Sequence, residues 1–232
     1  MNGEKVKVKG AKEVVVRGKF EDDLKELQNK LVELVTFADH ALAQSIVALE
    51  SHNIDLALEI MDDDTKADIL YEEINEFAIL LITKQQPVAI DLRRIIIAIK
   101  IATDIERIAD FAVNIAKSTI RIGQEPHVKP IIHLKKMYEI TAVMLKEGLE
   151  AYKEENTQLA KKVAEMDDEV DSLYGETIQE LLKLSAEKPE SLSQISQLLF
   201  ICRFLERAAD HITNVAEYVF YLVKGKHYDL NN

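Results

Sequence analysis

Two stretches of the chain, one hundred residues apart, carry acidic side chains at the same spacing. Each has a Glu-Arg pair with an Asp four residues after the Glu: Glu106-Arg107 with Asp110, and Glu206-Arg207 with Asp210. On an α-helix, residues four apart lie on one face, so each stretch presents two carboxylates together. Carboxylates supply the oxygen ligands that Mg²⁺, Mn²⁺, Ca²⁺ and oxidised iron prefer, so we expect metal binding.

Further acidic residues are expected at the same height in each half. Asp64 and Asp68 lie as far before Pro87 as Asp110 and Glu106 lie after it. Residues equally distant from the turn of an antiparallel helix hairpin lie at one level, because both helices rise equally per residue. This spacing predicts four carboxylates at one level of the first hairpin, although it does not fix which way each helix is rotated.

The second half repeats the arrangement around a point beside Pro189, with Asp167 and Asp171 opposite Asp210 and Glu206. Four converging carboxylates repel one another, so they require raised pKa values or a bound cation. We expect Arg107 and Arg207 to neutralise part of the charge. The predicted metal ligands are Glu106, Asp110, Glu206, Asp210, Asp64, Asp68, Asp167 and Asp171.

Other site chemistries lack their residues. No Glu is followed by His three residues later, as a ferritin-like di-iron site would require, and neither His nor Cys recurs between the halves as a zinc site would. His211 has Phe111 at the equivalent position, which indicates a surface or packing role. The chain contains no phosphate-binding glycine loop and no paired nucleophile and base, so we predict no catalytic residue and no enzyme.

The elements that position these residues are long helices, because only seven Gly and four Pro interrupt the chain. Apolar residues at three- and four-residue spacing predict an all-α fold of six helices, forming two pseudo-symmetric three-helix bundles. The expected helices cover about residues 20–51, 53–86, 88–123, 130–155, 156–188 and 191–223. The corresponding divisions are an extension (1–19), a first repeat (20–124), a second repeat (125–226) and a tail (227–232).

Composition excludes several classes of function. A net charge of −12 argues against nucleic-acid binding, and the lone Cys202 excludes a disulfide framework. Residues 1–19 are locally basic, and we interpret them as a disordered or cloning-derived extension. Charged residues are expected to interrupt every apolar run of membrane-span length, and the polar start shows no secretory signal. These features together predict a cytoplasmic protein.

These motifs resemble those of the PhoU family, the regulators that accompany phosphate transporters. The resemblance covers about residues 18–226. It is carried by residues 86–93 (QPVAIDLR), 104–110 (DIERIAD) and 205–211 (LERAADH). The halves differ at one place, because residues 91–93 (DLR) have no clean counterpart after Pro189.

The resemblance implies two three-helix bundles, usually a homodimer, with no established catalysis. It also implies multinuclear metal sites, of iron, manganese or magnesium, on the family's Glu/Asp-x-x-x-Asp motif. Glu106, Asp110, Glu206 and Asp210 match that motif, and the four Asp residues of the preceding helices are their counterparts. The implied partners are the transporter's ATPase subunit and a sensor histidine kinase. Through them the family damps phosphate uptake and the phosphate-starvation response, without inserting into the membrane.

Two alternatives remain open at this point. A metal-dependent hydrolase or phosphatase could use the same carboxylates, but it would need an apolar cleft and a cation to orient the substrate. A purely structural helical scaffold would have acidic faces that are merely solvated, which explains most isolated acidic pairs in a chain with 41 Asp and Glu residues. The sequence identifies neither the metal nor the partner surface.

Overall fold

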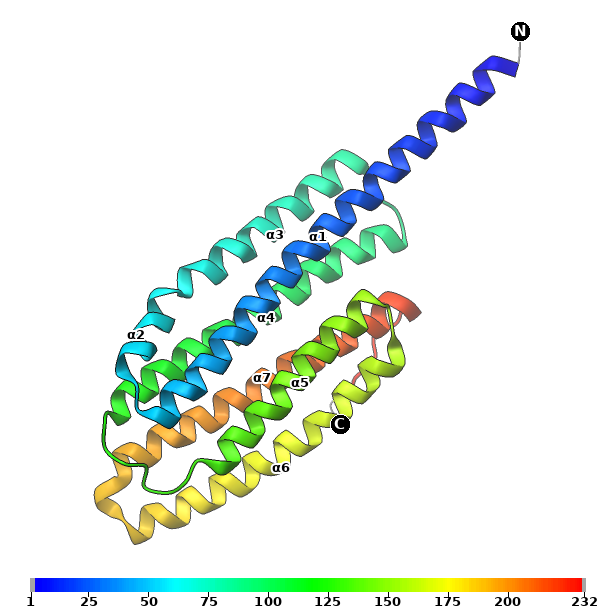
Figure 1. Ribbon diagram of the computed structural model, residues 1–232. Coiled ribbons are helices and arrows are strands. Elements are labelled where there is room, and N and C mark those ends of the chain that lie inside the picture. Colours follow the sequence, from blue (N-terminus) through cyan, green and yellow to red (C-terminus); the bar gives the residue numbers. More distant parts are fainter. Residues whose placement is uncertain (1–2, 231–232) are drawn as a thin grey trace.

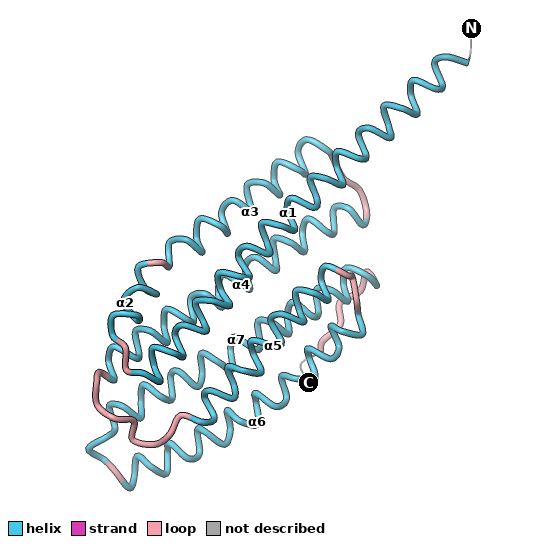
Figure 2. The backbone as a smooth tube through the Cα atoms, viewed as in Figure 1, coloured by secondary structure: helices cyan, strands magenta, loops and turns pink. Residues whose placement is uncertain are grey.

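The computed structural model describes the backbone of residues 3–230 and the side chains of residues 18–230. The described backbone is helical and contains no strand (Figure 2). In chain order the elements are α1 (Gly3–Ser51), α2 (Ile54–Asp62), α3 (Asp64–Gln85), α4 (Ile90–Ile122), α5 (Ile132–Lys153), α6 (Thr157–Glu187), the short 3₁₀ helix η1 (Pro189–Ser191) and α7 (Leu192–Lys224). The predicted all-α fold is confirmed.

Two three-helix bundles lie side by side (Figure 1). The first consists of α1, α2 with α3, and α4, and the second consists of α5, α6 and α7. The helices that carry the Glu-Arg stretches, α4 and α7, pack against each other between the bundles, and α1 also contacts α5. The apolar sides of α4 and α7 join both bundles into one hydrophobic core, which includes Ile101, Ile105, Leu205 and Ile212.

The two repeats begin their second helices in the same way. The side chain of Asn53 accepts a hydrogen bond from the backbone N–H of Leu56, and Asn156 caps α6 through Gln158 and Leu159. Such N-caps satisfy backbone donors that have no partner within the helix. The residue before each cap has a positive φ, 53° at His52 and 52° at Glu155. Asn53 therefore corresponds to Asn156, which sets the register for comparing the repeats.

The halves differ at Asp63, where the expected second helix is broken into α2 and α3. The break falls in the run Asp62-Asp63-Asp64. Aspartate is a weak helix former because its short side chain competes for nearby backbone N–H groups. In the second repeat, α6 continues without interruption from Thr157 to Glu187.

The first helix differs from the sequence prediction in two respects. Its backbone is helical from Gly3, whereas the sequence predicted a helix from Phe20. Contrary to expectation, an apolar window of α1 between Gly18 and Ser51 is long enough to cross a membrane. Half of that window is buried inside the bundle, so the core accounts for its apolar residues. Residues 231–232 of the expected tail lie outside the described residues.

Candidate metal centres

The first acidic cluster consists of Asp64 and Asp68 on α3 with Glu106 and Asp110 on α4. The two helices form the predicted hairpin around Pro87 and pack along each other. Burial raises the pKa of Glu106, and the charges of Asp110, Asp68 and Asp64 raise it further. Burial, followed by the charges of Asp110 and Asp68, also raises the pKa of Asp64. The four carboxylates therefore lie within electrostatic range of one another.

Arg107 offsets part of this negative charge. Its Nη1 donates to Asp110 Oδ2 at 2.9 Å, and its Nε lies 3.5 Å from Glu106 Oε2. Because the guanidinium is about half exposed, at 53 % of its side-chain surface, water screens these interactions. Arg107 thus occupies the neutralising role predicted for it, at the outer side of the cluster.

The second acidic cluster consists of Asp167 and Asp171 on α6 with Glu206 and Asp210 on α7. It is more buried than the first, because Asp167 and Glu206 expose only 4 % and 8 % of their surface. Burial raises the pKa of Asp167 to about 7, and the charges of Asp210, Asp171 and Glu206 contribute in the same direction. Burial and the charge of Asp210 likewise raise the pKa of Glu206.

Two buried carboxylate oxygens of this cluster have no hydrogen-bond partner, Asp167 Oδ1 and Glu206 Oε2. The other oxygen of Asp167 accepts a hydrogen bond from Thr213 Oγ1 at 3.1 Å. A buried anionic oxygen without a partner is energetically costly, so it points to a proton or a cation that the protein atoms do not supply.

The cation in direct contact with the second cluster is Arg203, whereas the predicted Arg207 acts at longer range, where its charge opposes the rise in the pKa of Glu206 and of Asp210. Arg203 Nη1 donates to Glu206 Oε1, whereas the Arg207 guanidinium lies over the Phe111 ring, 5.0 Å from its centroid. Residues three apart on a helix share a face, and adjacent residues do not. Arg203 lies three residues before Glu206, so this spacing makes it a candidate in the sequence, as it also makes Arg207 a candidate partner of Asp210.

The donor set fits a hard cation in its chemistry, since every predicted ligand is a carboxylate. Among the side chains of residues 18–230, however, no three Asp, Glu, His or Cys are arranged so that they could hold a metal ion. In each cluster the four predicted carboxylates are close enough for their charges to interact, but their oxygens do not surround a single metal position. Metal binding by either cluster therefore stays a prediction.

A polar contact that sequence reasoning missed joins the two repeats beside these clusters. Asp104 of α4 is buried and accepts hydrogen bonds from His211 Nδ1 at 2.6 Å and Asn214 Nδ2 at 3.1 Å, both on α7. At the corresponding place on the other side of the α4–α7 contact, Phe204 stacks on Phe111, with ring centroids 6.1 Å apart. His211 thus has a packing role, and a specific one.

These features define a tandem-repeat helical protein in which each three-helix bundle carries an acidic cluster between its last two long helices. The model of the PhoU domain matches the chain twice, over residues 31–119 and 134–219. The chain therefore belongs to the PhoU family.

Individual relatives agree with this assignment. A phosphate-specific transport system accessory protein PhoU homolog of Clostridium acetobutylicum is 40 % identical over 214 residues, covering 92 % of this chain and 98 % of the relative. The homolog of Rhizobium meliloti is 35 % identical over 207 residues, covering 89 % of this chain and 87 % of the relative. Because the relatives are named as accessory proteins, the prediction that the chain is not an enzyme is confirmed.

Solved structures share the fold. The crystal structure of PhoU from Pseudomonas aeruginosa matches with a TM-score of 0.85 at 28 % identity, covering 89 % of this chain and all of that chain. The phosphate transport system regulatory protein PhoU from Streptococcus pneumoniae also gives 0.85, at 26 % identity, covering 90 % of this chain and 99 % of that one.

Proposed function

We propose that this chain is a regulatory accessory protein of a phosphate-specific transport system. It acts as a cytoplasmic adaptor between the transporter's ATPase subunit and a sensor histidine kinase, and it lowers both phosphate uptake and starvation signalling when phosphate is plentiful. The observation that carries the proposal is the 40 % identity, over nearly the full length of both chains, to a relative named as such an accessory protein.

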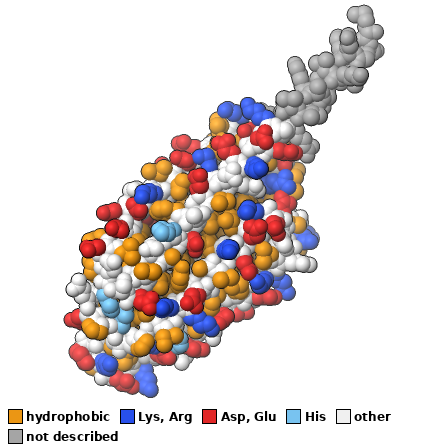
Figure 3. Space-filling view, in the orientation of Figure 1, with side chains coloured by type: hydrophobic (Ala, Val, Ile, Leu, Met, Phe, Trp, Pro, Cys, Tyr) orange, Lys and Arg blue, Asp and Glu red, His pale blue; other side chains and the backbone are white. Residues whose placement is uncertain are grey.

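Exposed apolar side chains at the tip of the α3–α4 hairpin support an adaptor role. They are Ile79, Leu80, Val88, Ile90, Leu92 and Ile96, with Val88 the most exposed at 74 %. Neighbouring apolar side chains that face water are typical of a surface that binds another protein. On the face drawn in Figure 3, acidic and basic side chains are mixed with apolar ones, as expected of a protein-binding surface rather than a nucleic-acid site.

Immobilised protein is expected to retain the purified ATPase subunit or the kinase's cytoplasmic part, and Val88→Glu is expected to reduce that retention about tenfold. The new charge would have to be desolvated in the interface, whereas an exposed side chain contributes little to folding. Ile132→Glu is the matched control, because Ile132 is 67 % exposed and lies outside the hairpin tip. Pull-down followed by quantitative blotting measures the difference.

If Val88→Glu instead converts a dimer into monomers in light scattering, the hairpin tip is the homodimer contact. A clean deletion strain that still represses phosphate-starvation genes at high phosphate would contradict the regulatory role itself.

We further propose that the two acidic clusters bind hard metal ions, such as iron, manganese or magnesium. The eight predicted carboxylates would be the ligands, and the ion would replace the missing partners of Asp167 Oδ1 and Glu206 Oε2. When bound, the metal would neutralise each cluster and stiffen the contact between its two helices. Repeating the pull-down after chelation distinguishes two roles for the metal. A loss of partner retention would indicate that the metal regulates partner binding, and unchanged retention would indicate that it only stabilises the fold.

The variant Glu106→Gln/Asp110→Asn is expected to differ from the parent mainly when metal is present. Without metal, lost repulsion offsets lost ion pairs with Arg107, so the two unfold within about 1 kcal/mol of each other. Metal that binds only the folded parent protein raises its free energy of unfolding by about 2.7 kcal/mol when the free metal concentration is a hundred times Kd. Melting after chelation, with and without Mn²⁺, Mg²⁺ and ferric iron, measures both states.

Glu72→Gln/Glu76→Gln is the matched control, because it makes the same charge change on an exposed part of α3. Equal metal responses in all three proteins would indicate solvated acidic faces and contradict the metal site in the first repeat.

A further inference from the structure

The turn between α3 and α4, at the hairpin tip, has an unfavourable backbone conformation. Gln86 and Ala89 have positive φ angles, 47° and 50°, which residues other than glycine rarely adopt. Ala89 is the N-cap of α4, but it has no side-chain oxygen to accept a hydrogen bond from the first turn of that helix. Val88, which lies between them, is exposed. Local interactions therefore do not explain why this turn keeps its conformation.

Arg93, in the first turn of α4, connects the hairpin tip to the last turn of α7. Its Nη1 donates to the backbone oxygens of Leu222 at 3.0 Å and Tyr221 at 3.5 Å, and its Cζ lies 5.3 Å from the centroid of the Tyr221 ring. The last carbonyl groups of a helix have no partner within the helix, and a cation is favourable there. At Gly225, just beyond α7, a Cβ atom would lie only 3.2 Å from two nitrogens of Arg93. Arg93 therefore fits closely against the end of the second repeat.

Arg94 connects the same part of α4 to the turn between α5 and α6. Its Nε donates to Glu155 Oε1 at 2.9 Å, its Nη2 lies 2.7 Å from the same oxygen, and its Nη1 lies 3.4 Å from Asp91 Oδ1. In Figure 1 the α3–α4 turn, the α5–α6 turn and the end of α7 lie at the same end of the molecule. The two arginines thus attach the hairpin tip to two separate parts of the second repeat.

The turn before α7 differs from this arrangement, just as residues 91–93 (DLR) lack a clean counterpart there. The spacing of one hundred residues between the two Glu-Arg stretches places Gln194 at the position of Arg94. The neutral amide of Gln194 is hydrogen-bonded to the linker between the repeats. No residue from 188 to 191 has a positive φ. Among the described residues, a strained turn, exposed apolar side chains and arginines bound to the other repeat thus coincide at the hairpin tip.

We infer that Arg93 and Arg94 are positioning residues for the partner-binding surface. They fix the strained turn against the second repeat, so that the exposed side chains of Val88, Ile90 and Leu92 meet a partner in one arrangement. A surface that is already ordered binds more tightly than one that a partner must first order. The effect on binding rests on the proposed role of the hairpin tip, whereas the fixing of the turn does not.

The first measurement is hydrogen exchange of the full chain, followed by mass spectrometry of its peptides. Arg93→Ala/Arg94→Ala is expected to raise the exchange rate of residues 86–96 about tenfold or more, because the lost hydrogen bonds involve charged groups. Arg121→Ala is the matched control, since it makes the same change at an exposed position in the last turn of α4, and it is expected to leave that rate unchanged.

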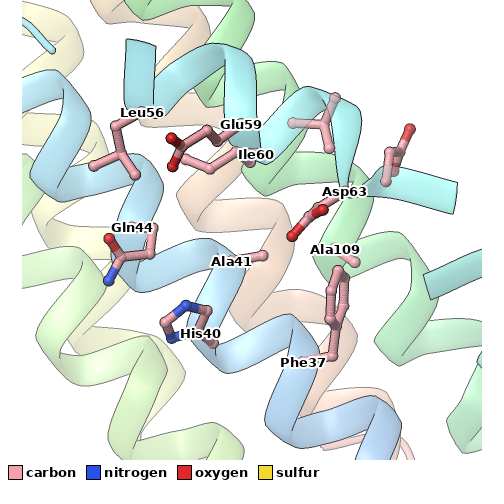
Figure 4. Close-up of a pocket in the computed structure, with 11 residues that line it drawn as sticks. Phe37, His40, Ala41, Gln44, Leu56, Glu59, Ile60, Asp63 and Ala109 are labelled. Atoms are coloured by element: carbon pink, nitrogen blue, oxygen red, sulfur yellow. The ribbon is translucent and has the colours of Figure 1, made fainter. Parts of the chain in front are cut away.

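The short helix α2 is the internal reference for a general loosening of the first bundle. It lies at the opposite end of the bundle from the hairpin tip, beside a pocket of about 210 Å³ (Figure 1). Figure 4 shows Leu56 and Ile60 of α2 facing Gln44 of α1 across this pocket. A variant that loosened the whole bundle would raise the exchange rate of α2 as well. A purely structural role of the arginines predicts that result, whereas a positioning role predicts an unchanged rate in α2.

The second measurement is the retention of the purified ATPase subunit and of the kinase's cytoplasmic part by the immobilised protein. The double variant is expected to retain about tenfold less, because affinity falls with the fraction of molecules in the binding arrangement. Val88→Glu should lower retention without raising the exchange rate of residues 90–96, which separates a contact residue from the positioning residues. Arg93→Lys keeps the charge but loses the planar guanidinium, so it should change both quantities less than the double variant does.

Unchanged exchange of residues 86–96 in a folded double variant would overturn the inference as a whole. Faster exchange with unchanged retention would overturn the positioning role, because the arrangement of the turn would then not matter to a partner. If the parent protein itself retains neither partner, the proposed function fails, and the exchange measurement alone decides whether the two arginines fix the turn.

Discussion

Replacing Asp104 by Ala is expected to lower the free energy of unfolding by about 3 kcal/mol, because two donors on the facing helix lose their acceptor. The carboxylate is 6 % exposed and accepts hydrogen bonds from His211 and Asn214, which lie 107 and 110 residues away in the chain. Its loss would leave both polar groups facing a cavity between the two repeats. Urea unfolding followed by circular dichroism measures the change.

Asp104→Asn provides the control, because it keeps one acceptor oxygen of the same shape and should lose less than half as much. His211→Ala combined with Asp104→Ala should cost less than the sum of the two single changes, since the pair is already broken by either one. Independent, additive losses would show that Asp104 and His211 do not act together across the α4–α7 contact.

This contact explains why the two halves of the protein are not interchangeable. On one side of the α4–α7 contact, the buried carboxylate of Asp104 accepts a hydrogen bond from His211. On the other side, the rings of Phe111 and Phe204 stack. Hydrogen bonds fix position and angle more narrowly than apolar contact does, and a buried polar group without a partner is costly. The polar side therefore sets the registration of one bundle on the other.

Local signals in the sequence were sufficient for most of the helix ends, although not for the start of α1 or for the break between α2 and α3. Asn53 and Asn156 cap the helices that follow them, and Pro87 and Pro189 end the helices that precede them. Both effects involve only neighbouring residues, so these helix ends could be predicted, and with them the residues that lie at the same level in each hairpin. The run of three Asp that breaks the second helix was visible in the sequence, but its effect depends on a balance of small propensities.

Contacts between helices could not be predicted in the same way. The convergence of each acidic cluster depends on how α3 and α6 are rotated, which packing against the core decides. The pairing of Asp104 with His211 requires α4 to lie on α7, so no spacing within one helix indicates it. Arg203 is the exception, because its distance of three residues from Glu206 is a local signal.

The stability of the metal-free protein is expected to fall as the pH rises from 5 to 8, and Asp167 is expected to be the main cause. Burial, together with the charges of Asp210, Asp171 and Glu206, raises the pKa of Asp167 from its ordinary value of 3.8 to about 7 in the folded state. The folded protein therefore holds a proton that the unfolded chain releases. A raised pKa of this kind contributes stability that is complete below the unfolded pKa and is lost as the pH passes the folded one.

Between pH 5 and 8 this loss amounts to about 3 kcal/mol for Asp167. Asp167→Asn removes the titrating group and keeps an acceptor for Thr213, so its stability should change far less over the same range, and it should exceed that of the parent at pH 8. Urea unfolding of both proteins in the presence of a chelator, at half-unit pH steps, gives the two profiles.

Asp64→Asn is the equivalent change in the more exposed first cluster, and it should alter the dependence of stability on pH much less. Burial is the main cause of the raised pKa of both Asp64 and Asp167, and Asp64 is the less buried of the two. Added Mn²⁺ or Mg²⁺ should flatten the profile of the parent alone, since a cation competes with the proton for the same oxygens. Parallel profiles for parent and Asp167→Asn would mean that Asp167 stays ionised in the folded protein. The second cluster would then have no unmet requirement for positive charge, and the strongest physical reason for placing a metal there would be lost.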